Sequence, residues 1–403
     1  METKLQKNEF KENQLEKNQL IEINIQGDKS QKEKIFRNIL IAGKDDKRFD
    51  ITISKGRFYS ITETQGIHQQ SSPLEDLWIS PGLIDLHTHL AWTDFDFDDQ
   101  LKRDKHEIEV MQSSAFEATL KTGITTVRDA GGLLPSEALY ISSHYHHPLR
   151  VLASGDMLGS KDAQGSIYLK RKVKEIESTG TKWLKIFATG GLGAPSDKVL
   201  EPLFSKQEFF SIVHSAHARN IKIMVHTWGG ITLDWAIEAG VDTVEHGVYL
   251  TENQSHALAE AGIPYIPTTA IYQIAADKNG VLSLGSELCN RAARAAEAHR
   301  KAITNATKAG VKIAFGTDFA TPALHGNNLE EIYSLMDCGL TRKEAWRSAT
   351  ESAAEILGYG GELGNIKAGF TSDAIIFKAD PYKTANAKEL KESIVSVITG
   401  IIE

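Results

Sequence analysis

The sequence predicts an α/β protein: a (β/α)8 barrel of the TIM type, with a small β-sandwich-like domain formed by both chain termini. First, a helical pattern that ends in glycine and is followed at once by a short apolar strand recurs at Gly123, Gly240, Gly262 and Gly310. Glycine just past a helix end supplies the left-handed residue that stops the helix. Second, strands alternate with helices, which favours a parallel sheet. Third, both ends of the chain have β character.

About eight barrel strands are expected, and eight strand–helix units in about 280 residues suit a (β/α)8 barrel. They lie near residues 83–89, 125–128, 150–154, 183–188, 222–227, 243–246, 265–268 and 312–318. Capping-box spacing marks three helix starts, at Ser205 with Glu208, Thr251 with Gln254, and Thr341 with Glu344. A doubly wound sheet is the alternative, but no glycine-rich phosphate loop follows the first strand.

The chain divides into three parts by composition. Residues 1–34 are charged and have little apolar content, so we expect a flexible tail. Alternation in Phe49–Ile53 and Phe58–Ile61, with Ser-Lys-Gly between them, predicts a hairpin. We expect residues 35–80 and 365–403 to form the small β domain together, and residues 81–364 to form the barrel.

Composition excludes several classes of protein. With 41% hydrophobic and 24% charged residues, the 403-residue chain is typical of a soluble globular protein. A net charge of -8 without a basic stripe disfavours nucleic acid as a partner. Cys289 and Cys338, the only cysteines, make no disulfide framework, and no run resembles a secretory signal or a membrane span. We expect a cytoplasmic protein with no membrane partner.

Chemically active side chains gather at the predicted carboxyl ends of the strands, where barrels of this type place their active sites. In the stretch WISPGLIDLHTHLAW, two histidines lie one residue apart and therefore share one face of a strand. Four of the 14 histidines fall at such strand ends, and imidazole with carboxylate suits Zn²⁺ and similar ions. The candidate metal ligands are His87, His89, His226, His246 and Asp318.

Lys185 lies in the apolar strand segment WLKIF. Burial disfavours the ammonium form and lowers the pKa of lysine. A neutral amine can add CO₂ and become a carbamate, an anionic oxygen ligand that is able to bridge two metals. The alternative is a lysine that pairs with Asp318 or Glu245, or whose charged end reaches outward to solvent. The spacing alone leaves both interpretations open.

Six motifs, in order, resemble those of the amidohydrolase superfamily: PGLIDLHTHL, GITTVRDAGG, WLKIFATGG, VHTWGG, DTVEHG and GVKIAFGTD. More narrowly, the chain is similar to imidazolonepropionase-related, prolidase-like metal-dependent hydrolases with a carboxylated lysine. The resemblance spans residues 35–382 and implies two divalent ions, Zn²⁺ above all. It implies one metal on His87, His89 and Asp318, a second on His226 and His246, and carboxylated Lys185 as the bridge.

The resemblance also implies the chemistry. A hydroxide that bridges the metals would attack the carbonyl, with Asp318 as general base and then general acid. The expected substrate is a small molecule with an amide bond, either a dipeptide or an N-acyl amino acid, and we expect a homo-oligomer. One alternative is a non-peptide substrate, namely a cyclic amide, lactone, carbamate or organophosphate. Another is an inactive relative that only binds ligands, which the complete set of six residues disfavours.

Further residues have weaker expected roles. Tyr249 follows the sixth strand, and the resemblance implies a catalytic role in which it touches the substrate or assists the carbonyl; the alternative is a surface or packing tyrosine. His325 is expected to contact the substrate or to be a solvated loop residue. We expect Arg128 to tie the barrel rim together or to orient Lys185, and Glu245 to support the site. Many relatives carry a Gly-Gly-His loop after the third strand. Here that stretch reads ASGDMLGSKDAQGSIYL and has no histidine, so recognition of the substrate is expected to differ.

Overall fold

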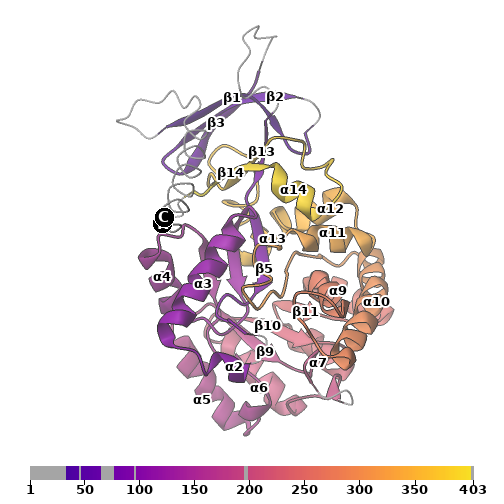
Figure 1. The fold of residues 1–403 in the computed structure, drawn as a ribbon. Coiled ribbons are helices and arrows are strands. Elements are labelled where there is room, and N and C mark those ends of the chain that lie inside the picture. The colour runs from indigo at the N-terminus through magenta and orange to yellow at the C-terminus, as the bar shows by residue number, and fades with distance from the viewer. Residues whose placement is uncertain (1–32, 45–46, 65–76, 95–96, 195–197, 401–403) are drawn as a thin grey trace, which may run out of the picture.

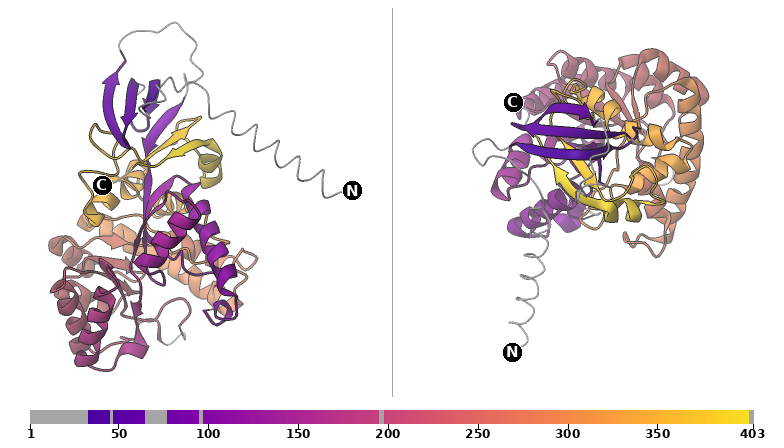
Figure 2. Two further views of the ribbon diagram at one scale, coloured as in Figure 1. Left: turned by 90° about the vertical axis from the view of Figure 1, so that its left-hand side faces the viewer. Right: turned by 90° about the horizontal axis from the view of Figure 1, so that it is seen from above.

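The computed structural model of the protein describes residues 33–44, 47–64, 77–94, 97–194 and 198–400 (Figure 1). The expected tail at residues 1–34 lies outside this part of the chain, except for its last two positions. The fold is the predicted barrel with a terminal β sheet. Figure 2 shows the sheet at one end of the molecule and the helices on the outside of the barrel strands.

Both chain ends contribute to one six-stranded sheet, as predicted. Its strand order is β14-β13-β4-β1-β2-β3, and β13 runs antiparallel to β4. The predicted hairpin is present, and its Lys55-Gly56 loop has positive φ at both residues, as turns of the primed type require. The strands are β1 (Lys34–Ile41), β2 (Arg48–Ser54), β3 (Arg57–Glu63), β4 (Trp78–Pro81), β13 (Ala374–Phe377) and β14 (Ile394–Ile398).

The barrel strands pair in parallel, in the orders β5-β6-β7 and β12-β11-β10-β9-β8. Their carboxyl ends therefore meet at one rim, which is what brings distant histidines together. The strands are β5 (Leu83–Thr88), β6 (Ile124–Asp129), β7 (Arg150–Ala153), β8 (Met157–Leu158), β9 (Trp183–Phe187), β10 (Lys222–Thr227), β11 (Thr243–His246) and β12 (Tyr265–Ile266).

The segment 312–318, predicted as the eighth strand, is not a regular strand. It still closes the barrel between β12 and β5, through single bridges from Ile313 to Tyr265 and from Phe319 to Thr88. Asp318 has a φ of 56°, a left-handed conformation that interrupts an extended strand. The segment therefore occupies the expected place with only isolated pairings.

The helices form the outer layer of the barrel. Capping boxes are present at the three predicted starts, and Gly240, Gly262 and Gly310 end their helices in the left-handed conformation. No described helix is long and apolar enough to cross a membrane. The helices are α2 (Phe97–Gln100), α3 (Lys105–Leu120), α4 (Pro135–His144), the 3-10 helix η1 (Ser160–Asp162), α5 (Ser166–Glu177), α6 (Lys206–His217), α7 (Ile231–Ala239), α8 (Glu252–Ala261), α9 (Thr269–Ala276), α10 (Ser286–Ala309), α11 (Glu330–Asp337), α12 (Arg342–Ser348), α13 (Glu351–Leu357) and α14 (Ala387–Ser393).

Two apolar layers hold the barrel rigid. Between strands and helices, side chains such as Phe116, Ile212 and Val225 are fully buried. Inside the barrel, Leu86 and Met224 belong to a second buried cluster. Because both faces of the strands are packed, the side chains at their carboxyl ends are held in fixed positions.

Candidate metal centre

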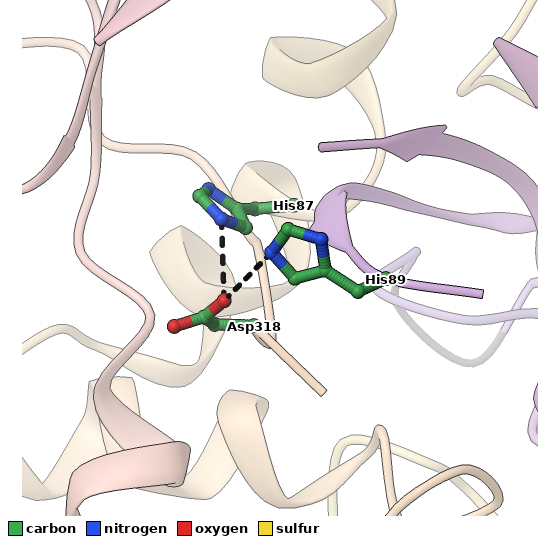
Figure 3. A group of neighbouring side chains, drawn as sticks. All are labelled: His87, His89 and Asp318. Atoms are coloured by element: carbon green, nitrogen blue, oxygen red, sulfur yellow. Dashed lines mark ion pairs between the residues drawn. The ribbon is translucent and has the colours of Figure 1, made fainter. Parts of the chain in front are cut away.

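Three predicted ligands form one compact group (Figure 3). His87 lies on β5, His89 follows that strand, and Asp318 comes from the segment that closes the barrel. Their ligand atoms all lie within 4.8 Å of one another. Oδ1 of Asp318 is 3.3 Å from Nε2 of His87 and 3.3 Å from Nε2 of His89. Such a set of two imidazoles and one carboxylate can hold a divalent ion.

The other predicted ligands surround this group. The ring centroid of His246 is 4.8 Å from that of His87 and 4.4 Å from that of His226. Nζ of Lys185 lies 3.0 Å from Nε2 of His87, and the lysine side chain is fully buried. The structure thus brings four histidines, one aspartate and one lysine to the same rim.

The hydrogen bonds of the histidine rings test whether these residues fit a metal. A ligating histidine ordinarily uses its other ring nitrogen to bind the protein. Nδ1 of His87 donates to Oε2 of Glu245 at 2.5 Å, and Nδ1 of His89 donates to the Gly131 carbonyl at 3.1 Å. Nε2 of His226 donates to the Gly190 carbonyl at 2.9 Å.

His246 completes this pattern, because its Nδ1 is hydrogen-bonded to Oγ1 of Thr268 at 2.8 Å. Each of the four rings therefore has one nitrogen bound to a supporting residue, which leaves the second nitrogen for a metal. This is the arrangement that the metal ligands of a Zn²⁺ site require, and the donor set fits the group that the sequence implies.

Burial and charge set the protonation of the group. Desolvation lowers the pKa of His226 to about 3 and holds the pKa of His246 well below its usual value, so both rings are neutral. Burial also lowers the pKa of Lys185 to about 8, against the opposing charges of Glu245 and Asp318. Burial raises the pKa of Asp318, but His87 and His89 more than offset this and hold it well below the ordinary value.

An ion pair inside the barrel supports His87. Arg128 and Glu245 are both fully buried, and Nη2 of the arginine lies 2.9 Å from Oε1 of the carboxylate. Oε1 also accepts a hydrogen bond from Thr243, and the guanidinium lies 4.4 Å from the centroid of the Trp183 ring. Arg128 was expected to tie the rim together or to orient Lys185. The structure shows that it orients His87, through Glu245, and that Glu245 supports the site as expected.

Asp85 supports the position of Asp318. It shares a strand face with His87 in the sequence pattern, yet it contacts the backbone and not the metal group. Its carboxylate accepts hydrogen bonds from the Thr317 amide at 3.1 Å and the Thr317 hydroxyl at 2.8 Å. Asn328 donates to the same carboxylate at 3.2 Å. These bonds fix the backbone beside Asp318.

Several supporting residues were not predicted. His246 has a φ of 67°, an uncommon left-handed conformation of the kind that clusters at functional sites. Its carbonyl accepts hydrogen bonds from the Tyr265 hydroxyl and from Nε2 of His299, both at 2.7 Å. Trp92 stacks on the His89 ring with centroids 4.5 Å apart. Neither His299 nor Trp92 lies in a predicted strand, and Tyr265 begins one instead of ending it, so the search at carboxyl ends of strands carried no signal for these three residues.

The two residues with weaker expected roles lie in different settings. Tyr249 is 38% exposed, and its ring is 6.1 Å from that of Trp228, beside the strand that carries His226. His325 is only 5% exposed, so it is not a solvated loop histidine. Its Nδ1 lies 3.3 Å from Oγ1 of Thr119 on α3. Contact of either residue with substrate remains a prediction.

Gly191 packs against the ring of His226 and offers a test of that ligand. A Cβ at Gly191 would lie 2.9 Å from Cε1 and 3.0 Å from Nε2 of His226, whereas a Cβ at Gly193 would meet nothing within 4 Å. Gly191→Ala should therefore displace the ring and weaken metal binding about tenfold or more, as losses around metal ligands do. Gly193→Ala is the matched control. Equal affinities of Gly191→Ala and the parent in a metal titration would exclude His226 as a ligand.

Comparison with known proteins places the chain among hydrolases. The model of the amidohydrolase family matches residues 78–400. An ochratoxinase from Aspergillus niger is 26% identical over 361 residues, which cover 80% of this chain and 74% of the relative. An imidazolonepropionase from Acidiphilium cryptum is 23% identical over 347 residues, covering 75% and 79% of the two chains.

Solved structures share the fold. A prolidase complexed with N-methylphosphonate-L-proline has a TM-score of 0.81 at 22% identity, covering 92% of this chain and 100% of its own. A Xaa-Pro dipeptidase with methionine in its active site has a TM-score of 0.76 at 24% identity, covering 90% and 100%.

Proposed function

Because this chain belongs to the amidohydrolase family, whose model spans residues 78–400, we propose that it cleaves the amide bond of a dipeptide or an N-acyl amino acid with two divalent metal ions, Zn²⁺ above all. One observation carries the proposal. Four histidines, Asp318 and Lys185 converge on one rim, and each histidine ring has one nitrogen hydrogen-bonded to a supporting residue outside this group.

The ligands divide between two ions by position. His87, His89 and Asp318 would hold the first ion, because their ligand atoms form the compact group. His226 and His246 would hold the second, since their rings are neighbours. A carboxylated Lys185 would lie between them. Nζ of Lys185 lies 3.0 Å from Nε2 of His87, so the lysine is beside the ligands that a carbamate would join.

Asp318 would act as the general base and then as the general acid of the reaction. Bound divalent ions supply an acidified water and a polarised scissile carbonyl. The Asp318 carboxylate accepts a proton from the attacking water, and it gives that proton to the leaving nitrogen as the carbon–nitrogen bond breaks. Its side chain is 23% exposed, so it is accessible to a substrate while still contacting both histidines.

A second candidate function is hydrolysis of a non-peptide substrate, namely a cyclic amide, lactone, carbamate or organophosphate, by the same centre. The segment from Ala153 to Leu169 favours it, because this segment lacks the histidine that the prolidase-like pattern leads us to expect there. The same metal ligands would serve either substrate class, so the two candidate functions are distinguished by testing both kinds of substrate.

The test is a hydrolysis screen of protein purified with Zn²⁺ and bicarbonate. Dipeptides and N-acyl amino acids form the first panel, read by amine release, and the non-peptide classes form the second. We expect cleavage of a group of amides that share one C-terminal residue. If protein with both metals bound hydrolyses nothing in the first panel, the proposal is overturned. Hydrolysis of a substrate in the second panel would then establish the alternative.

A further inference from the structure

A cavity of about 460 Å³ opens beside His226. Its size is within the range of about 300–1,000 Å³ that is usual for small-molecule sites. Two loops form it, one after β8 and one after β9, and these carry residues 157–161 and 187–193. Among the proposed metal ligands His226 alone lines this cavity, so a molecule in it would border the metal centre along the ring of His226.

The walls of the cavity are mainly apolar. They include the side chains of Met157, Phe187, Leu192 and Leu203, and the ring of Phe187 lies 5.0 Å from that of His226. Four glycines, at 159, 190, 191 and 193, and the hydroxyl residues Ser160 and Thr189 also line the cavity. An apolar group would bury well against the apolar part of these walls.

Lys161, in η1, is the one lysine, arginine, aspartate or glutamate among the described residues that line the cavity. Its neighbour Asp162 is already engaged, because its Oδ2 accepts a hydrogen bond from the Gly159 amide at 3.0 Å. Within the described part of the chain Lys161 has no ion-pair partner, and its side chain is exposed. The cavity therefore offers one uncommitted positive charge at its edge.

We propose that this cavity takes the amino-acid half of the substrate that leaves as the amine, and that Lys161 binds its free carboxylate. The inference rests on the proposed function and deepens it. The substrate class is then an amide whose released amino acid has an apolar side chain and an unblocked carboxylate. Lys161 would be a specificity-determining residue, in the same loop that lacks the expected histidine.

A matched pair of substrates tests the role of Lys161. Ala-Leu carries the carboxylate, and Ala-leucinamide differs only by its neutral amide. We expect the parent to prefer Ala-Leu, and Lys161→Ala to lower kcat/KM for Ala-Leu about tenfold through a higher KM, the size of a lost bond to a charged group. Activity on Ala-leucinamide should stay unchanged. Lys161→Arg should keep most of the preference.

Binding and control measurements complete the test. Lys170→Ala removes the same charge from an exposed position on α5 that does not line the cavity, and should behave as the parent. Calorimetry with L-leucine should show about tenfold weaker binding to Lys161→Ala. If the parent cleaves both substrates and Lys161→Ala has the same ratio of kcat/KM for Ala-Leu to kcat/KM for Ala-leucinamide, the role of Lys161 is overturned but the proposed function is not. A metal-loaded parent that cleaves neither substrate would overturn both.

Discussion

Replacing Asp318 with asparagine should lower kcat by about 10³-fold, in the middle of the range for loss of a general acid–base group. Asparagine keeps the size of the side chain and one oxygen near His87 and His89. In the parent, Oδ1 of Asp318 lies 3.3 Å from Nε2 of each of these histidines. The asparagine cannot take up the proton of the attacking water. The free energy of unfolding should change far less than the rate.

Metal content must be counted in that experiment, because Asp318 is also a proposed ligand. The rate is therefore compared per metal-loaded chain, with Zn²⁺ supplied in excess. Asp156→Asn is the control, since it removes a carboxylate from an exposed position after β7 and should leave turnover intact. An unaltered kcat in Asp318→Asn would remove this residue from the role of base.

Lys185→Ala should lower metal occupancy and activity together. The lysine is fully buried with Nζ 3.0 Å from His87, so its removal deletes the proposed bridge and leaves a space beside the ligands. Short carboxylic acids should fill that space and restore part of the activity. Metal analysis and hydrolysis rates, with and without added acetate, measure both effects.

An exposed lysine just before the same strand serves as the control for this change. Lys182 directly precedes β9, and Lys182→Ala should keep metal and rate. If Lys185→Ala holds two metals and turns over at the full rate, the carboxylated bridge is wrong. The buried lysine would then serve only the packing and charge balance of the barrel.

Much of the fold follows from local patterns. The bounds of β10 and β11 agree with the sequence prediction to the residue, and the helix starts at Ser205, Thr251 and Thr341 have the expected caps. Periodicity and capping depend on neighbours in the chain, so they can be read locally. The two-residue β8 and the irregular closing segment depend on pairing with distant strands, which local patterns do not contain.

The candidate site, like the fold, was predicted only in part. The proposed histidine and aspartate ligands lie at the ends of predicted strands, so the barrel topology was enough to bring them together. His299 was missed because it lies on α10 and acts on the carbonyl of His246, a contact that depends on tertiary packing. The Glu245 partner of Arg128 was not predicted either. Alternation along a strand gives the face of a side chain but not the carboxylate it meets across the barrel.

The most direct test of the metal centre is the rate of amide hydrolysis as Zn²⁺ is returned to protein stripped by a chelator, with metal per chain counted at each step. The substrate is the best dipeptide or N-acyl amino acid of the screen. We expect no turnover without metal and a rate that rises until two ions are bound per chain. Full turnover by the stripped protein, or a rate that saturates at one ion, would contradict a binuclear amidohydrolase centre.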